Sequence, residues 1–285
     1  MFYEGQEISS KVRRSFNTLK NHIIFIFAVK PSLHIVINVL KSLLLIFLPI
    51  FIRIPLFQKL THEYFTIKLK DYQLFTNVPS IHLASEIYLG EEHEAYQEFR
   101  LQKGIIVVDV GAHYGFYSIK AASLGALKVI AIEPHPQNFQ ILSYNKHQNN
   151  ATNVILYNIA LSDSEKQLKF YVGPSSTSGT IVEEQVNNHP IDFDGEYLTV
   201  KTRTLDSILA EERISPTIIK IDVEGAELQV LHGAINCLKS SQVKLVVECH
   251  SALLTQQVRH FLIACGFQKI AGKKRIGGYI LYASK

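Results

Sequence analysis

The chain has 285 residues, of which 47% are hydrophobic and 19% are charged. This length suits one α/β domain with an extra segment, or two small domains, and the composition excludes a disordered chain, a collagen-like repeat and a disulfide scaffold. The three cysteines, Cys237, Cys249 and Cys265, show no C-x-x-C spacing. We therefore expect neither a disulfide framework nor a thiolate zinc site, and we expect a reducing compartment.

The net charge of +4 is unevenly distributed along the chain. Residues 1–60 hold eight basic and two acidic side chains, whereas the remaining 225 residues hold 21 basic and 23 acidic ones. A nucleic-acid-binding protein usually carries basic residues across its working face. We therefore expect no nucleic-acid partner.

The basic N-terminal segment is also the most apolar part of the chain. Its longest charge-free run, residues 42–52, is shorter than the roughly 20 residues that a membrane-spanning helix needs. A helix here would align four polar side chains in one narrow stripe: Lys30, His34, Asn38 and Lys41. This pattern predicts that residues 1–60 form a helical extension whose residues 23–57 contact a membrane surface, at its cytoplasmic face. The alternatives are a helix packed on the rest of the chain or on a partner subunit, a membrane span and an export signal.

From residue 61 onward, strand-like runs alternate with helical stretches. Buried strands are predicted over residues 105–110, 128–132, 154–159, 218–223 and 244–248, and helices over residues 116–124, 139–148 and 254–265. Two last strands, near residues 267–271 and 278–282, flank a basic glycine-rich turn. The alternation predicts that residues 61–285 form a doubly wound, Rossmann-like α/β domain with a mostly parallel sheet and one antiparallel strand near its end.

Polar residues follow these strands at the edge where ligands bind in doubly wound sheets. Gly111 and Gly115 let the backbone turn tightly and approach a ligand. Asp109 suits an ammonium group, and Glu133 suits the two hydroxyls of a ribose. The loop lacks the third glycine of a dinucleotide fingerprint and the Lys-Ser/Thr pair of a P-loop, which disfavours NAD and ATP. S-adenosylmethionine, which has an amino-acid end, a ribose and a sulfonium, matches these residues.

Six segments then occur in a fixed order: VVDVGAHYGFYSIKAA (107–122), VIAIEPHPQNFQIL (129–142), NIALSD (158–163), TLDSIL (204–209), IIKIDVEGAELQVLHGA (218–234) and LVVECH (245–250). With them, the chain from about residue 64 resembles the FkbM family of S-adenosylmethionine-dependent methyltransferases. The resemblance implies a seven-stranded methyltransferase fold and methyl transfer to a hydroxyl oxygen of a sugar, a glycan or a related natural product. It also implies that Asp109, Gly111 and Gly115 line the methionine end of the cofactor, that Glu133 binds the ribose, and that Asp163 lies near the adenine.

Methyl transfer to oxygen needs an aligned acceptor and a group that takes the hydroxyl proton. Asp222 and Glu224 follow one strand, and Glu248 and His250 end the next. Because alternate residues of an extended chain point to the same side, each pair is expected to face one cleft, with Lys220 one step deeper. We predict that Asp222 lies near the transferred methyl group and that His250 or Glu224 is the base.

Other interpretations of these residues stay open. Asp222 and Glu224 could begin the next helix, or the four residues of the two pairs could bind a divalent cation, although we assign no metal. An NAD-type oxidoreductase and a non-catalytic binding protein that keeps the fold are the competing functions. A polar loop at residues 175–180 is expected to select the acceptor. The sequence indicates no oligomeric state.

Overall fold

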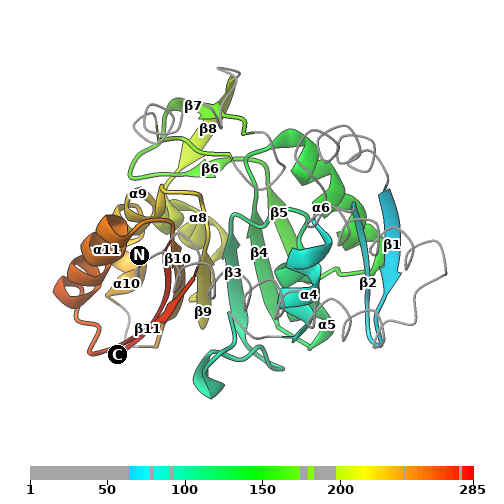
Figure 1. Ribbon diagram of the computed structural model, residues 1–285, viewed down its shortest axis with the longest axis horizontal. Helices are drawn as coiled ribbons and strands as arrows, with labels where there is room; N and C mark the ends of the chain where they lie inside the picture. The colour runs from blue at the N-terminus through cyan, green and yellow to red at the C-terminus, as the bar shows by residue number, and fades with distance from the viewer. Residues whose placement is uncertain are drawn as a thin grey trace, which may run out of the picture. The chain divides into compact units, whose positions relative to one another are not determined.

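The computed structural model of the chain describes residues 64–77, 80–89, 93–173, 179–182, 197–239, 242–275 and 278–285 (Figure 1). The chain divides into two compact units, Met1–Leu89 and Gly90–Lys285. This division falls later than the boundary at residue 60 that the composition suggests. The N-terminal extension and most of the acceptor-selecting loop lie outside the described residues, so their predictions stay predictions.

The described part of the first unit is small. Strands β1 (Tyr64–Lys68) and β2 (Gln73–Asn77) form an antiparallel pair, and helix α4 (Ile81–Leu89) follows. The sequence pattern did not predict this pair, because polar residues interrupt both strands and four of the five side chains of β1 are exposed or half-buried, so neither strand is a continuous apolar run.

The second unit is built on a seven-stranded sheet in the order β11-β12-β10-β9-β3-β4-β5. Its strands are β3 (Ile106–Val110), β4 (Lys128–Ile132), β5 (Val154–Tyr157), β9 (Ile218–Ile221), β10 (Lys244–Cys249), β11 (Lys269–Lys274) and β12 (Tyr279–Ser284). The five strands from β5 to β10 are parallel, and β12 is antiparallel to both of its neighbours. The predicted doubly wound, mostly parallel sheet is therefore confirmed.

Helices connect the parallel strands, as the alternation of the sequence predicts. They are α5 (Phe116–Ser123), α6 (Pro136–Gln148), α8 (Leu205–Glu212), α9 (Glu227–His232), α10 (Ile235–Leu238) and α11 (Ala252–Ala264), with a short 3₁₀ turn, η2 (Gln97–Phe99), before the sheet. Three of these helices, α6, α8 and α11, have a side-chain N-cap. His135 Nδ1, Thr204 Oγ1 and Ser251 Oγ each accept a hydrogen bond from a backbone N–H of the first turn. No helix in the described part of the chain is both long and apolar enough to cross a bilayer.

The core explains why the parallel strands are continuous apolar runs. Both faces of β3, β4, β9 and β10 are covered, so nearly every side chain in them is buried. One cluster joins Val108, Ile130 and Ile219 of the sheet to Leu231 of α9 and Val258 of α11. These buried strands form a rigid platform whose carboxyl ends present the polar residues.

A second, three-stranded sheet lies between β5 and α8 in the chain and was not predicted. It has the order β6-β8-β7 and consists of β6 (Ala160–Leu161), β7 (Gln167–Tyr171) and β8 (Tyr197–Arg203). Among the described residues, its buried core consists of Ala160, Phe170 and Val200, with partly buried hydrophobic side chains packed against them, and several side chains of β7 and β8 are exposed. Strands with so little buried surface carry no strong hydrophobic pattern in the sequence.

Candidate active site

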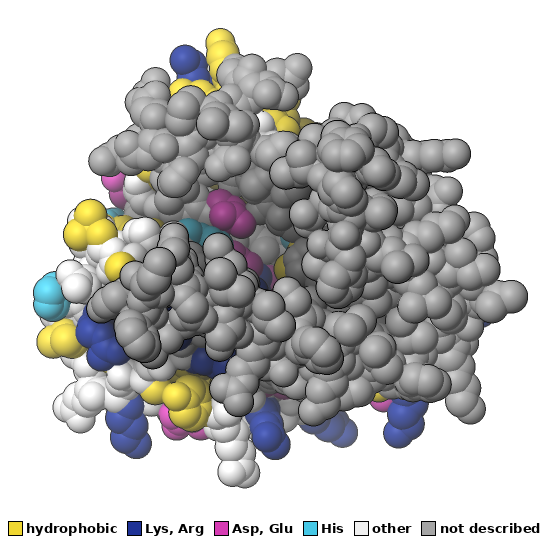
Figure 2. All heavy atoms as spheres, viewed as in Figure 1, with side chains coloured by type: hydrophobic (Ala, Val, Ile, Leu, Met, Phe, Trp, Pro, Cys, Tyr) yellow, Lys and Arg dark blue, Asp and Glu magenta, His cyan; other side chains and the backbone are white. Residues whose placement is uncertain are grey.

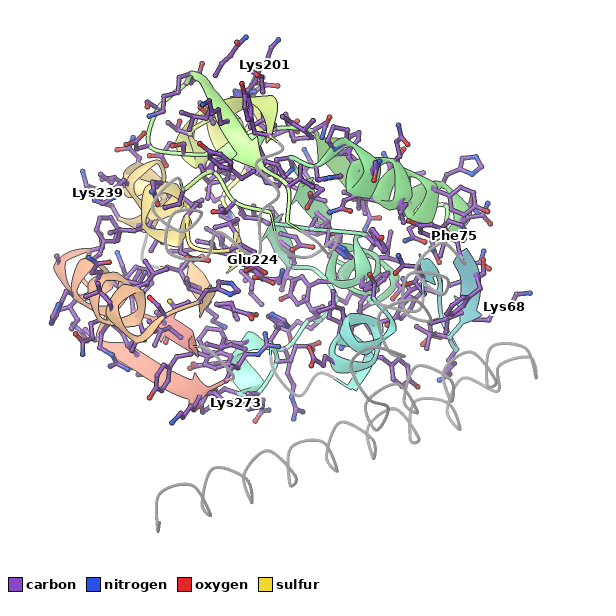
Figure 3. All side chains as sticks on the ribbon, turned by 45° about the horizontal axis from the view of Figure 1, so that its top comes forward. Lys68, Phe75, Lys201, Glu224, Lys239 and Lys273 are labelled. Carbon is purple, nitrogen blue, oxygen red and sulfur yellow. The ribbon has the colours of Figure 1, made fainter. Side chains whose placement is uncertain are left out.

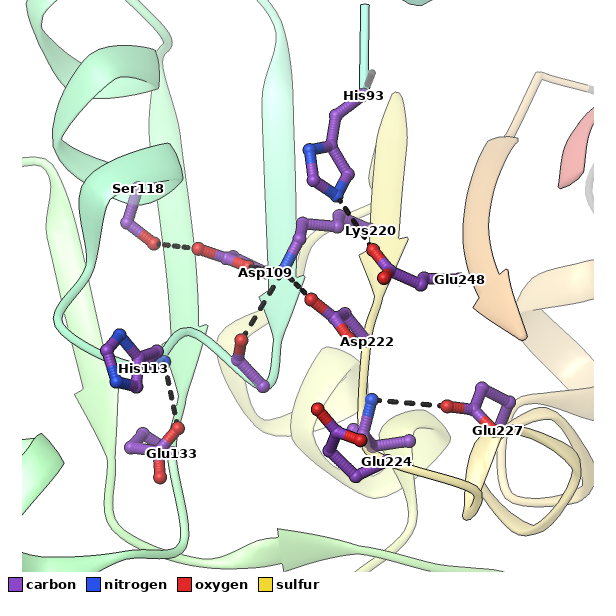
Figure 4. A network of polar contacts seen from close by, with 12 residues as sticks. His93, Asp109, His113, Ser118, Glu133, Lys220, Asp222, Glu224, Glu227 and Glu248 are labelled. Atoms are coloured by element: carbon purple, nitrogen blue, oxygen red, sulfur yellow. Dashed lines mark hydrogen bonds and ion pairs between the residues drawn. The ribbon is translucent and has the colours of Figure 1, made fainter. Parts of the chain in front are cut away.

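Except for Asp163, the predicted site residues lie at or directly after the carboxyl ends of β3, β4, β9 and β10 (Figure 4). Along the chain the sheet grows from β3 toward β5 in one direction and from β9 toward β11 in the other, so the order reverses between β3 and β9. Ligands of doubly wound sheets bind at such a reversal. In the space-filling view, acidic and histidine side chains are visible inside a hollow near the centre of the face (Figure 2).

The loop after β3 requires its two glycines. Gly111 has a φ of +76°, and a Cβ atom there would lie 1.8 Å from the backbone oxygen of Asp222. Gly115 has a φ of +82°, and its Cβ would lie 2.2 Å from Leu142 Cδ1 of α6. The first glycine thus allows the loop after β3 to touch the loop after β9, and the second allows α6 to pack against the start of α5.

Glu133 lies at the end of β4 and is only 5% exposed. Its Oε2 accepts a hydrogen bond from the backbone N–H of His113 at 2.8 Å, and its Oε1 accepts one from that of His135 at 2.9 Å. No Lys or Arg of the described residues forms an ion pair with it. Burial raises the pKa of Glu133 to about 7 against these backbone hydrogen bonds. A carboxylate held this way can accept further hydrogen bonds from two neighbouring hydroxyls.

Asp109 of β3 is fully buried. Ser118 Oγ of α5 donates to its Oδ2 at 2.7 Å, and Lys220 Nζ lies 3.4 Å from its Oδ1. The carboxylate therefore links β3, α5 and β9 beneath the loop of Gly111. Its predicted place at the methionine end of a cofactor stays a prediction.

Asp163 belongs to the segment of the three-stranded sheet. It follows β6, its side chain is half exposed, and its Oδ1 accepts from Ser164 Oγ at 2.7 Å and pairs with Lys166 Nζ at 3.3 Å. The residue that directly follows β5 is Asn158, whose Nδ2 donates to the backbone oxygen of Glu133 at 2.8 Å. Asp163 as an adenine contact thus stays a prediction.

Four side chains of alternating charge contact one another in a row: Lys220 of β9, Asp222, His250 and Glu224. Lys220 Nζ lies 3.4 Å from Asp222 Oδ2, and Asp222 Oδ1 lies 3.2 Å from His250 Nε2. His250 Nδ1 in turn lies 3.3 Å from Glu224 Oε2. The structure therefore brings together Asp222, Glu224 and His250, the three residues predicted to be catalytic.

The pKa values of Asp222, Glu224 and His250 are shifted in different directions, which gives these three side chains different roles. Burial alone would lower the pKa of His250, but Asp222, Glu224 and Glu227 raise it to about 10. Burial alone would raise the pKa of Asp222, but Lys220 and His250 hold it well below its usual range. Burial raises the pKa of Glu224 to about 7 in spite of His250. At neutral pH, His250 is an imidazolium, Asp222 is ionised, and Glu224 titrates.

The local geometry differs from the prediction for Asp222 and Glu224. Strand β9 ends at Ile221, and Glu224 adopts a left-handed φ of +52°, so the rule for alternate residues of an extended chain does not apply. The two side chains converge because His250 lies between them. The alternative that they begin a helix is wrong, because α9 starts at Glu227 with Ala226 as its N-cap.

Glu248 and His250 also have different surroundings. Glu248 Oε1 forms an ion pair with Arg275 Nη1, and its Oε2 lies 3.5 Å from His93 Nε2. Asp222 is near both groups, which form two clusters, His93 with Asp222 and Glu248, and Asp222 with Glu224 and His250. The four residues considered as one cation site thus divide between two clusters.

Sequence reasoning missed His93, Glu227 and Arg275. Glu227 Oε1 accepts from the backbone N–H groups of Val223 and Gly225, at 3.3 and 3.1 Å, and fixes the turn that carries Glu224. The run VEGAE was the only local signal for Glu227, since it places this residue three positions after the predicted catalytic residue Glu224. Arg275 lies in the basic glycine-rich turn, whereas no local pattern distinguishes His93.

A doubly wound sheet with a glycine loop and ionisable side chains at its switch point defines this protein as a Rossmann-like α/β protein. Residues 109–269 match the family model described as the methyltransferase FkbM domain, which is more than half of the chain. The chain therefore belongs to the FkbM methyltransferase domain family, and the resemblance predicted from its motifs is confirmed.

The chain is also similar to individual proteins. The chain is 30% identical over 158 residues to the hexuronic acid methyltransferase AglP of Haloferax volcanii, covering 55% of this chain and 61% of that protein. It is 27% identical over 144 residues to Methyltransferase 1 of Beauveria bassiana, covering 45% and 57% of the two chains. The chain thus spans about three-fifths of these relatives. A solved FkbM methyltransferase from Methylobacillus flagellatus KT is 20% identical, with a TM-score of 0.47 over 72% of this chain and 54% of that one.

Proposed function

We propose that the protein is an S-adenosylmethionine-dependent methyltransferase that modifies a hydroxyl group of a sugar or glycan. The observation that carries this proposal is the buried carboxylate of Glu133, which no cation of the described residues neutralises and which lies at the switch point beside the loop of Gly111. A buried carboxylate of this kind suits two hydroxyl donors. Family membership supports methyl transfer as the reaction.

The residues at the switch point fit S-adenosylmethionine. Glu133 would hold the ribose hydroxyls, and the space that a Cβ at Gly111 would fill lets the backbone approach the amino-acid end, with the buried charge of Asp109 beneath it. When bound, S-adenosylmethionine supplies a methyl group on a positively charged sulfur, which an oxygen nucleophile can displace.

The chain's own residues would handle the acceptor proton. Glu224 is the better base, because its pKa of about 7 keeps much of it deprotonated at neutral pH while its side chain stays 35% exposed. His250 carries a proton up to a pKa of about 10, so it would hold Glu224 and Asp222 in position. Asp222 links this pair through Lys220 to the Gly111 loop.

The acceptor class follows from chemistry and from one relative. AglP is named as a hexuronic acid methyltransferase, and we extend a sugar acceptor to this chain as part of the proposal. The basic and apolar residues 23–57 support a further part of it, that the enzyme works at a membrane surface on a glycan presented there.

Calorimetry of S-adenosylmethionine binding tests the cofactor site. We expect micromolar affinity for the full chain and a loss of about 1.5–3 kcal/mol in Glu133→Ala, as for loss of a charge-assisted hydrogen-bonding group. Glu165→Ala, which removes a carboxylate that is 60% exposed in the loop between β6 and β7, is the matched control and should bind normally. If the wild-type chain bound NAD instead, the oxidoreductase alternative would replace this proposal; binding neither would favour a non-catalytic protein.

The reaction itself is tested with S-adenosylmethionine labelled on its methyl group. We expect label in glycosides of uronic acids or neutral sugars, and we expect it to survive mild alkali, because a methyl ether resists conditions that hydrolyse a methyl ester. Label that alkali releases would move the reaction to a carboxylate and contradict transfer to a hydroxyl oxygen.

A further inference from the structure

The cluster of His93, Asp222 and Glu248 contains buried polar atoms that the proposed function does not use. One possible ligand atom from each residue lies within 4.8 Å of the others. His93 is 7% exposed, and neither of its ring nitrogens has a hydrogen-bond partner; Glu248 Oε2 has none either. The imidazole of His93 points directly at Glu248 (Figure 4).

The separation of these two groups is informative. His93 Nε2 lies 3.5 Å from Glu248 Oε2, which is longer than an ordinary N–H···O hydrogen bond of about 2.9–3.0 Å. Two ligand atoms bound to one cation at about 2.0–2.2 Å lie roughly 3.0–3.5 Å apart. The pair therefore fits two ligands of a shared cation better than it fits a donor and an acceptor.

The charge balance of the surroundings points the same way. Five carboxylates lie in and around the cluster, those of Asp109, Asp222, Glu224, Glu227 and Glu248, against the three cationic side chains Lys220, His250 and Arg275. Acidic side chains thus outnumber basic ones around the cluster, which favours a cation there.

Neighbouring cationic groups already orient the two carboxylates. Lys220 Nζ lies 3.4 Å from Asp222 Oδ2 and His250 Nε2 lies 3.2 Å from Asp222 Oδ1, whereas Arg275 holds Glu248 Oε1 and leaves Oε2 to face His93. Hydrogen bonds of this kind fix ligating carboxylates in metal sites. One imidazole nitrogen with two carboxylates suits Mn²⁺ or Zn²⁺ better than Ca²⁺, which prefers oxygen ligands alone.

We propose that His93, Asp222 and Glu248 bind a divalent transition-metal cation of the Mn²⁺ type. The site shares Asp222 with the proposed catalytic residues and takes neither Glu224 nor His250 as a ligand. Its role rests on the proposed function: a cation here would favour the deprotonated form of an acceptor hydroxyl beside Glu224. The binding of the cation can be tested without that function.

Titration of the full chain with Mn²⁺, followed by the electron paramagnetic resonance signal of free Mn²⁺, tests the site. We expect one equivalent bound, with at least tenfold weaker affinity in His93→Ala and in Glu248→Gln. Glu224→Gln should bind Mn²⁺ like the wild type, because Glu224 belongs to the other cluster. Glu165→Gln is the control for loss of an exposed carboxylate.

A second measurement keeps the test decisive if a variant fails to fold. Pulsed resonance of Mn²⁺ bound to the wild-type chain should show coupling to one nitrogen. Absence of Mn²⁺ binding, a bound ion without nitrogen coupling, or affinity lost in Glu224→Gln but kept in His93→Ala would each overturn the site. Calorimetry of S-adenosylmethionine on the same samples separates the two proposals, since cofactor binding without Mn²⁺ binding overturns this one alone.

Discussion

The backbone of Gly111 touches the backbone of Asp222 so closely that no side chain can lie between them: a Cβ atom on Gly111 would be 1.8 Å from the Asp222 oxygen. The loop that is proposed to hold the cofactor and the loop that carries the proposed catalytic residues are therefore in direct contact. Lys220 adds a second link, because its Nζ lies 3.4 Å from both Asp222 Oδ2 and the backbone oxygen of Gly111.

Gly111→Ala should therefore lose both stability and cofactor binding. The left-handed φ costs a non-glycine residue about 1–2 kcal/mol, and the clash with Asp222 must also be relieved by moving one of the loops. We expect at least a 100-fold loss of S-adenosylmethionine affinity by calorimetry. Gly104→Ala is the matched control, because Gly104 has a φ of +88° with nothing within 4 Å of its Cβ position. Gly104→Ala should therefore lose only the stability that the left-handed φ costs, which thermal unfolding measures, and it should bind the cofactor normally.

Glu224→Gln should remove the proposed base and leave the proposed cofactor site intact. Loss of a general base lowers turnover by roughly 10²–10⁴-fold, while S-adenosylmethionine affinity should stay unchanged. Because Glu224 acts as a carboxylate and has a pKa of about 7, wild-type turnover should fall as the pH drops through 7. The residual activity of the variant should lack this inflection. A variant that kept the inflection would assign it to another group, with Glu133 the first to examine.

Lys220→Met should destabilise the second unit strongly. Lys220 is 4% exposed and pairs with Asp109 and Asp222, so its loss leaves buried carboxylates without their cation. Breaking a buried pair in this way costs about 3–5 kcal/mol, measurable by urea unfolding. Lys201→Met is the control, since Lys201 lies on an exposed face of β8, far from Glu224 (Figure 3). The double variant Lys220→Met with Asp109→Asn should recover part of the loss; equal stabilities of the single and double variants would contradict the pairing.

His250 should make stability depend on pH in a definite direction. Its pKa rises from about 6.5 in the unfolded chain to about 10 in the fold. The protonated form is therefore stabilised by folding, so the contribution is complete below pH 6.5 and is lost as the pH rises toward 10. Urea unfolding should show the wild-type chain losing roughly 3–5 kcal/mol across this range relative to His250→Gln. His147→Gln, which changes an exposed histidine, should show the same pH dependence as the wild type. A difference in unfolding free energy between wild type and His250→Gln that did not change with pH would contradict the raised pKa of His250.

Charged vesicles test the predicted membrane contact. Residues 1–60 carry six net positive charges, so the full chain should sediment with anionic vesicles more than with neutral ones, and less so at high salt. Replacing Lys30 and Lys41 by Glu should reduce the binding, whereas Lys239→Glu, in the second unit, should not. Equal binding to neutral and anionic vesicles would contradict an electrostatic contribution.

The sequence predicted the parallel strands well because burial on both faces produces continuous apolar runs such as those of β3 and β4. It predicted the residues at their carboxyl ends for the same reason, since the end of an apolar run marks the edge of the sheet. It did not predict β7 and β8, whose exposed side chains lack such a run.

The parts of the site that were missed depend on contacts between distant segments. His93 precedes the first strand of the seven-stranded sheet and meets Glu248 only after folding, more than 150 residues later in the chain. The rule of alternate residues predicts an extended chain at Glu224, whereas Glu224 forms a turn that Gly225 directly after it signals. Local patterns thus predicted which residues gather at the edge, but not which of them contact one another.

The three-stranded sheet has a consequence for how such an enzyme can change. Strands β7 and β8 pair with each other and β6 pairs with β8, so none of them hydrogen-bonds to the seven-stranded sheet. The segment between β5 and α8 can therefore gain, lose or exchange residues while every strand pairing beneath the proposed catalytic groups is kept. Since this segment includes the loop that is predicted to select the acceptor, rebuilding it would alter the proposed acceptor site and leave the buried strands unchanged.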